Sequence, residues 1–307
     1  MVCLSDSLPF ATCDVFTNSA FAGNPLAIVE DADGLSDTAM QTIAREFNLS
    51  ETIFVRRPLD PAHTASVRIF FPTAEIPFAG HPTIGCAIHL ALKSAPAGDF
   101  AADITLEEVA GLVPVRVWRQ DGRIAAEFRA PVLPHPADTG RVPENAAIAA
   151  ALGLTVAQIG FDGHRPGLWQ GGPTFAYAPL RDSAALSAAR PNGAAWEALC
   201  AATGVNALYI YTGGDGVDFS ARLFAPGDGV PEDPATGSAS AILAAQLLTS
   251  GALTEGETTL TLLQGADMGR PSEIGLRIVT QGAALQAVYV SGSAVPVSQG
   301  RITPPTG

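Results

Sequence analysis

Positive charge is scarce in this sequence. Its 307 residues include 17 Lys and Arg against 30 Asp and Glu, which gives a formal net charge of -13 and a sequence pI near 4.7. Binding to a phosphate backbone requires clustered Lys and Arg side chains. We therefore expect no nucleic-acid partner.

Long apolar runs and basic N-terminal residues are also missing. The mean hydropathy is +0.24, but no run of about 18 uninterrupted apolar residues occurs, and alanine supplies much of the apolar character. No Lys or Arg precedes Arg45, so the chain lacks the basic segment of a signal peptide. We expect a cytoplasmic protein with no membrane partner.

Cysteine is rare and scattered. The four cysteines are Cys3, Cys13, Cys86 and Cys200, and none forms a Cys-x-x-Cys pair. This spacing is typical of reduced thiols rather than of a disulfide framework or a zinc site. We expect no structural metal.

The sequence has ample material for a buried core. Hydrophobic residues make up 47% of the chain and charged residues 15%, which excludes an intrinsically disordered protein. At roughly 100 to 200 residues per domain, the length indicates about two domains.

Local patterns predict a mixture of helices and strands. A helix is expected from the N-cap Ser36 to about Asn48, because apolar residues recur at helical spacing; they are Met40, Ile43, Ala44 and Phe47. Residues 50–55 and 67–71 read as strands. A second helix is expected up to about Leu92, with Pro82 as its first residue.

The second half of the chain repeats the order of the first. The matching segments are 40–54 with 196–210 (offset 156), 68–72 with 222–226 (offset 154), 81–87 with 233–239 (offset 152) and 23–25 with 171–173 (offset 148). The period is too long for a solenoid. We infer a duplicated α+β unit whose two copies are related by a pseudo-twofold axis and joined by the proline-rich segment 130–136.

These observations place an N-terminal domain at residues 1–131 and a C-terminal domain at residues 132–290. Two alternatives stay open for residues 291–307: a strand that belongs to the N-terminal domain, or a short tail of unassigned role. The segment Gly213–Gly216 lacks the Lys-Ser/Thr ending of a phosphate-binding loop, and we interpret it as a hairpin connection.

Ionisable residues break the internal symmetry. Glu51 corresponds to Ala207, so one carboxylate has no counterpart, and His81 corresponds to Asp233. Glu51 shares its strand face with Ile53, which favours a partly buried carboxyl whose pKa is raised by desolvation. Such a group suits a general base that later returns the proton as an acid. The alternative is a solvated glutamate at a strand end.

Each half also places a helix N-terminus after a loop rich in glycine and proline. Unpaired N–H groups and the helix dipole make such ends attractive to anions. If the pseudo-twofold axis brings the His81 and Asp233 loops together, a cleft between the domains holds a small carboxylate without Lys or Arg. The alternative is ordinary capping by Asp233, with Gly85 and Gly237 serving only close packing.

Four segments resemble the phenazine biosynthesis PhzF-like family: residues 16–25, 44–52, 78–83 and 233–239. The resemblance extends from about Thr12 to about Val290. It implies an α+β protein of diaminopimelate epimerase-like fold: two pseudo-symmetric domains, each a curved, mostly antiparallel sheet wrapped around a central helix, with the site between them.

The resemblance also implies residue roles. Glu51 matches the proton-shuttling glutamate, and the substrate-binding candidates are His81, Asp233, Gly80, Gly237, Ser238 and Asn24. The family chemistry uses no cofactor and no metal. Related epimerases use a cysteine pair at positions that match Ala79 and Thr236 here, so a two-thiol racemase is disfavoured.

The sequence thus predicts a cofactor-independent isomerase that moves a proton on a small carboxylate, cyclic or unsaturated, as in dihydro-hydroxyanthranilate isomerisation. The alternatives are an epimerase or dehydratase of a small hydroxy or amino acid, and a non-catalytic metabolite-binding protein of the same fold. We expect a homodimer.

Overall fold

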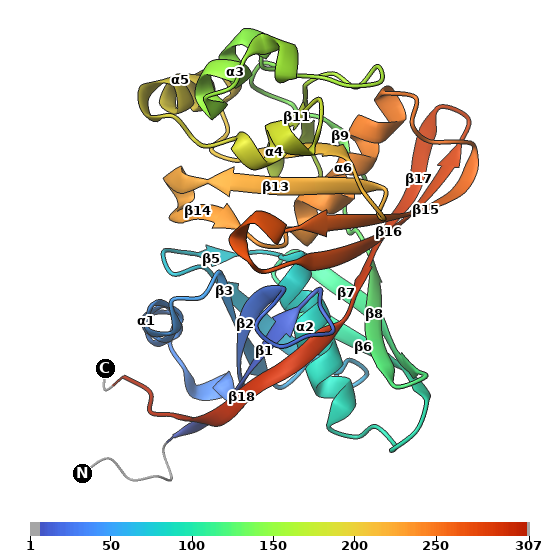
Figure 1. Ribbon diagram of the computed structural model, residues 1–307. Helices are drawn as coiled ribbons and strands as arrows, with labels where there is room; N and C mark the ends of the chain where they lie inside the picture. Colours follow the sequence, from blue (N-terminus) through green and yellow to red (C-terminus); the bar gives the residue numbers. More distant parts are fainter. Residues whose placement is uncertain (1–6, 306–307) are drawn as a thin grey trace. The chain divides into compact units, whose positions relative to one another are not determined.

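The computed structural model describes residues 7–305. Contacts between Cα atoms divide them into two compact units. The first unit comprises the described residues up to Pro131 together with those from Ser291 onwards, and the second comprises Val132–Val290. Figure 1 labels most of the elements of both units.

Strands of the first unit form a mixed sheet. Its strands are β1 (Leu8–Val15), β2 (Asn24–Val29), β3 (Glu51–Arg56), β4 (Ala65–Phe70), β5 (Glu75–Ile76), β6 (Phe100–Glu108), β7 (Gly111–Gln120), β8 (Arg123–Arg129) and β18 (Ala294–Ile302). β2 pairs with β3, and β4 with β6, in parallel. All other pairs within this unit are antiparallel: β18 with β1, β1 with β2, β3 with β4, β4 with β5, β6 with β7 and β7 with β8. Strand β18 therefore belongs to the first unit.

The helix α2 (Gly80–Leu92) is the centre of this unit. Most of its residues are buried, and it contacts strands from both ends of the sheet, including β1, β2, β6, β7 and β8. Gly85 permits this close packing, because a Cβ atom there would lie 2.7 Å from Leu26 and 2.8 Å from Val15.

The helix α1 (Asp37–Phe47) packs against β3 and β4 through a separate apolar cluster that includes Met40, Ile43 and Phe54. Its boundaries follow local signals. The Ser36 hydroxyl accepts a hydrogen bond from the Ala39 N–H, and Asn48 ends the helix in a left-handed conformation with φ 51°. The prediction of a helix from Ser36 to Asn48 is confirmed.

The second unit repeats the pairing scheme of the first. Its strands are β9 (His135–Pro136), β10 (Gly167–Gln170), β11 (Thr174–Pro179), β12 (Leu208–Gly213), β13 (Phe219–Ala225), β14 (Val230–Asp233), β15 (Gly256–Gln264), β16 (Ser272–Gln281) and β17 (Ala284–Gly292). Two pairs are parallel, β11 with β12 and β13 with β15. Four pairs are antiparallel: β10 with β11, β12 with β13, β13 with the short β14, and β15 with β16. Strands β1 to β7 of the first unit pair in the same order and with the same directions. The antiparallel pair of β12 and β13 confirms the predicted hairpin at Gly213–Gly216.

The helix α6 (Gly237–Thr249) takes the place of α2 in the second unit, where it contacts β9, β10, β11 and β16. Three further helices, α3 (Asn145–Leu152), α4 (Ser183–Ala188) and α5 (Gly193–Thr203), share a second apolar cluster that contains Trp196 and Phe224. Each unit thus has one central helix surrounded by strands, and the predicted α+β fold class is confirmed.

One predicted boundary is wrong. Pro82 is the third residue of α2 and not the first, because the helix begins at Gly80 after the N-cap Ala79. The N–H and the hydroxyl of Thr83 both bond to the Ala79 carbonyl and extend the helix backwards. In the described part of the chain, no helix has the length and apolar character needed to cross a membrane.

Candidate active site

Glu51 occupies the first position of β3. The chain enters this strand from the left-handed Asn48 that ends α1, and Glu51 lies opposite Leu26 in the parallel pair of β2 and β3. Only 8% of the residue is exposed. The solvated strand-end glutamate considered as an alternative is therefore wrong, and Glu51 is a buried carboxyl.

His81 lies beside Glu51. It is the second residue of α2, and its Nδ1 is 3.3 Å from Oε2 of Glu51, which is ion-pair distance. Burial lowers the pKa of His81 to about 3, and the hydrogen bond with the Pro25 backbone opposes this only in part. The imidazole is consequently neutral at physiological pH.

The two ring nitrogens of His81 have different roles. Because Nε2 makes no hydrogen bond within residues 7–305, the bond to the Pro25 backbone comes from Nδ1, and we assign the imidazole proton to Nδ1. Nε2 is then an acceptor, and within the described residues this buried atom makes no hydrogen bond. A buried acceptor without a partner is costly unless a ligand supplies a donor.

The N-terminus of α2 is uncapped by any side chain. The N-cap is Ala79, whose methyl side chain cannot accept hydrogen bonds from the N–H groups of the first turn. The first helical residue is Gly80, which is buried. Of the first three helical residues, Gly80 and His81 have N–H groups without a partner in the helix, and Pro82 has no N–H group. This end is suited to an anion such as a carboxylate.

Asn24 begins β2, next to the same site. It is completely buried and lies opposite Val15, two positions before the partner of Glu51. Gly23 before it has φ +66°, and a Cβ atom there would lie 2.3 Å from the Val15 carbonyl oxygen. The turn at Gly23 therefore requires glycine and fixes the entry of Asn24 into the strand.

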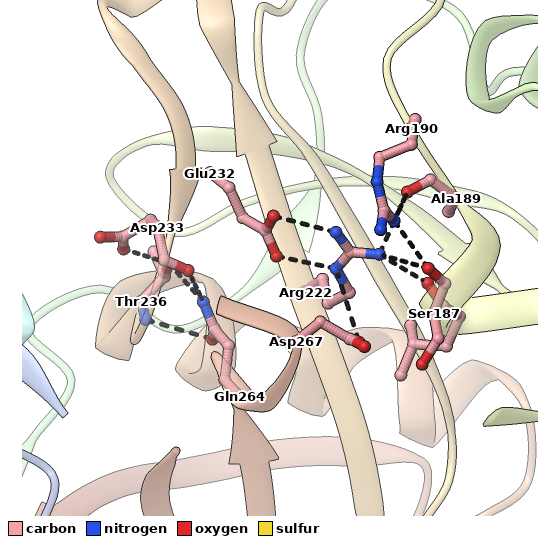
Figure 2. A network of polar contacts seen from close by, with 10 residues as sticks. Ser187, Ala189, Arg190, Arg222, Glu232, Asp233, Thr236, Gln264 and Asp267 are labelled. Atoms are coloured by element: carbon pink, nitrogen blue, oxygen red, sulfur yellow. Dashed lines mark hydrogen bonds and ion pairs between the residues drawn. The ribbon is translucent and has the colours of Figure 1, made fainter. Parts of the chain in front are cut away.

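Asp233 ends β14 in the second unit and is 8% exposed. The alternative that Asp233 serves only as the cap of α6 is wrong, because Thr236 is the N-cap and α6 begins at Gly237. The Thr236 hydroxyl donates to Oδ2 of Asp233 at 2.5 Å, as Figure 2 shows. Gly237 is buried and Ser238 is half-buried.

Gln264 joins Asp233 to the helix and was not found from the sequence. It is fully buried at the end of β15. Its Nε2 donates to the Asp233 carbonyl at 2.8 Å and to the Thr236 hydroxyl at 3.0 Å, and its Oε1 accepts from the Thr236 N–H at 3.2 Å (Figure 2). A fully buried amide with three such bonds fixes the loop that carries Asp233.

Arg222 holds the strand that ends in Asp233. Its guanidinium makes a bidentate bond to Glu232 at 2.7 and 2.9 Å and reaches the carbonyls of Leu186 and Ala189 (Figure 2). Successive residues of a strand point to opposite faces. The clamp on Glu232 therefore directs Asp233 to the other face of β14.

The structure brings together two groups of predicted residues, each within one unit. Glu51, His81, Gly80 and Asn24 belong to the first unit, and Asp233, Gly237 and Ser238 to the second. The buried thiols are not candidates for proton transfer. Burial raises the pKa of Cys13 to about 12 and raises that of Cys86 as well.

Comparison with known proteins identifies the family. A sequence model described as phenazine biosynthesis-like protein (PhzC-PhzF) matches residues 13–300. An uncharacterized isomerase of Mesorhizobium japonicum is 43% identical over 295 residues, which cover 94% of this chain and 96% of the relative. The trans-2,3-dihydro-3-hydroxyanthranilate isomerase of Pseudomonas aeruginosa is 36% identical over 292 residues, with 95% and 98% covered. The chain belongs to this family.

The fold agrees with that of a solved family member. The crystal structure of a PhzF-family protein from Bacillus anthracis covers 96% of this chain and 99% of its own, with a TM-score of 0.83 at 24% identity. The resemblance inferred from the sequence motifs is thus confirmed, and the chain is an isomerase of the PhzF family.

Proposed function

We propose that this isomerase moves a proton by general acid–base catalysis without a cofactor, on a small carboxylate that is cyclic or unsaturated. The first compound to test is trans-2,3-dihydro-3-hydroxyanthranilate, the substrate named for the Pseudomonas aeruginosa relative. The observation that carries the proposal is the buried carboxyl of Glu51 beside the neutral His81.

Glu51 removes a proton from a carbon that is activated by conjugation with the substrate carboxylate, and it returns the proton to another carbon. A carboxyl suits both steps, because it accepts a proton as a carboxylate and returns it as the acid. The double bond moves, and no atom is gained or lost.

The remaining candidates bind the substrate in this proposal: His81, Asp233, Gly80, Gly237, Ser238 and Asn24. Nε2 of His81 accepts a hydrogen bond from a hydroxyl or amino group of the substrate. The N–H groups at the uncapped start of α2 bind the carboxylate and the negative charge that develops during proton removal.

The test is to incubate the enzyme with this compound in deuterated water and follow the reaction by NMR and mass spectrometry. We expect a shifted double bond in a product that keeps all heavy atoms, and the deuterium content at the new C–H position measures how much of the transferred proton exchanges with solvent on Glu51. Inverted stereochemistry would instead identify an epimerase, and loss of water a dehydratase. Tight binding without any hydrogen exchange would identify a non-catalytic binding protein.

A further inference from the structure

A second buried carboxyl lies in the first unit, away from Glu51 in sequence. Glu108 is the last residue of β6, which packs against α2, and 7% of it is exposed. Its Oε1 is 2.7 Å from the hydroxyl oxygen of Thr83. The same hydroxyl oxygen is 2.7 Å from the carbonyl oxygen of Ala79, the N-cap of α2.

The hydrogens of these three groups can be counted. The Thr83 hydroxyl has one hydrogen, whereas the Ala79 carbonyl and an ionised Glu108 are both acceptors only. An ionised Glu108 would leave one of the two short contacts without a hydrogen. A protonated Glu108 satisfies both, since the carboxyl donates to Thr83 and Thr83 donates to Ala79.

The second unit has a neutral group in the equivalent place. The parallel pairs Ala65–Leu106 and Phe219–Leu262 have the same register, so Glu108 of β6 corresponds to Gln264 of β15 at an offset of 156. Gln264 bonds to the N-cap of α6 directly, and Glu108 bonds to the N-cap of α2 through Thr83. A carboxyl donates as the Gln264 amide does only when it is protonated.

Among residues 7–305, no cation contributes to the pKa of Glu108, on which only burial and the Thr83 hydrogen bond act. From α2 the ionisable group that interacts with it is Cys86, a buried thiol with a raised pKa. Arg116 of β7 and Glu127 and Arg129 of β8 alternate with buried residues and lie on the outer face. Arg68 of β4 is bound to Glu75 and Asp37.

We infer that Glu108 is a protonated carboxylic acid that positions the first turn of α2, with Gly80 and His81, and that its ionisation at alkaline pH releases this turn and limits the reaction. Glu108 is a positioning residue, and the inference rests on the function proposed for that turn. Burial supports it, because desolvation raises the pKa of Glu108 to about 8.

Neutrality also serves the proposed chemistry. A negative charge near the N-terminus of a helix interacts favourably with the dipole and would compete with a substrate carboxylate for the same positive end. A neutral acid at Glu108 orders the turn without this competition.

The first measurement needs no substrate. The ¹³C resonance of the Glu108 side-chain carboxyl, assigned by its absence in Glu108→Gln, is followed through a pH titration of the whole protein. We expect a protonated carboxyl at pH 7 and a midpoint near pH 8. An ionised carboxyl at pH 7 overturns the inference, whatever the substrate proves to be.

The second measurement is the pH profile of kcat/KM for trans-2,3-dihydro-3-hydroxyanthranilate. We expect the wild type to lose about tenfold per pH unit above pH 8, as for one ionisation. Glu108→Gln keeps the donor, so its kcat/KM at pH 7 stays within about threefold of wild type and the alkaline loss disappears, while Glu108→Leu and Thr83→Val lower kcat/KM at every pH.

The matched control is Glu107→Gln. Glu107 is the neighbouring residue on β6, and hydrogen bonds from the backbone N–H groups of Asp60 and Leu59 lower its pKa to about 2. Its variant should keep the alkaline loss. An alkaline loss that persists in Glu108→Gln, or a folded but inactive Glu108→Gln, overturns the inference. Absence of any turnover by the wild type counts instead against the proposed function.

Discussion

Oε2 of Glu51 lies 3.3 Å from Nδ1 of His81, and both side chains are almost completely buried. Two elements far apart along the chain create this relationship, since Glu51 begins β3 and His81 lies in the first turn of α2. Because burial keeps His81 neutral, it does not fix the charge of the Glu51 carboxyl by forming an ion pair. Glu51 therefore remains able to take up a proton.

Replacement of Glu51 by glutamine tests the proton transfer itself. Glutamine keeps the shape of the side chain and cannot act as a base, so we expect kcat to fall by about 10² to 10⁴ with little change in KM. The measurement is steady-state kinetics together with deuterium exchange. Glu46→Gln on the exposed face of α1 is the control and should match the wild type. Equal turnover by Glu51→Gln would remove Glu51 from the mechanism.

His81 and Glu108 contribute to the pH dependence of stability with opposite signs. The pKa of His81 falls from 6.5 in the unfolded chain to about 3 on folding, so the unfolded state binds more protons between these values and stability rises with pH. The pKa of Glu108 rises from 4.5 to about 8, so stability falls with pH between those values. Each slope is about 1.4 kcal/mol per pH unit.

The two slopes cancel where they overlap, between the 4.5 of unfolded Glu108 and the 6.5 of unfolded His81. Urea unfolding at a series of pH values should therefore show the Glu108 decline alone between pH 6.5 and about 8. His81→Gln removes the rising component and Glu108→Gln the falling one, and the difference from wild type isolates each group. A Glu108→Gln curve parallel to wild type from pH 6.5 to 8 contradicts the prediction.

Gly85 is predicted to be intolerant of a methyl group. A Cβ atom there would lie 2.7 Å from Leu26 of β2 and 2.8 Å from Val15 of β1, and α2 packs against both strands. Gly85→Ala gains helix propensity of about 1 kcal/mol, but we expect a net loss of stability of about 1 to 3 kcal/mol because overpacking displaces α2. The free energy of unfolding measures this. Gly34→Ala, with nothing within 4 Å of the added atom, is the control and should change it by less than about 0.5 kcal/mol.

Local signals in the sequence were sufficient for part of the fold. Ser36 and Asn48 define α1 because capping depends on neighbours within one turn. The predicted start of α2 is two residues too late, because the contacts of Thr83 with Ala79 outweigh the preference of Pro82 for the first helical position. The asymmetry between Glu51 and Ala207 pointed correctly to a buried carboxyl.

Other features depend on partners that are distant in sequence. Glu108 and Gln264 each stand alone at a strand end, and their hydrogen-bond partners lie on the central helix or its N-cap, so no local period marks them. The only signal was their common offset of 156, which the repeats around Met40 and Trp196 also have. The pairing of β18 with β1 joins the two ends of the chain and has no local signature either.

The equivalent arginines of the two units provide the last prediction. Arg222 and Arg68 both bind a glutamate of the next short strand and both stack on a phenylalanine two residues later. The Arg222 side chain is 3% exposed and its partner Glu232 18%, whereas Arg68 is 17% exposed and its partner Glu75 30%. The same pair is therefore much more desolvated in the second unit.

Removal of one partner from a desolvated pair leaves a buried charge uncompensated. For Arg222→Met we expect a loss of about 3 to 5 kcal/mol in the free energy of unfolding, and for the matched Arg68→Met a loss of about 1 kcal/mol, since water solvates the remaining carboxylates. Arg222→Met also releases β14, so it should weaken substrate binding by Asp233 even at temperatures where the protein stays folded. Equal losses for the two variants would mean that burial does not determine how much the arginine–glutamate pair contributes to the free energy of unfolding. A KM unaffected by Arg222→Met would show that Asp233 is held by Thr236 and Gln264 alone.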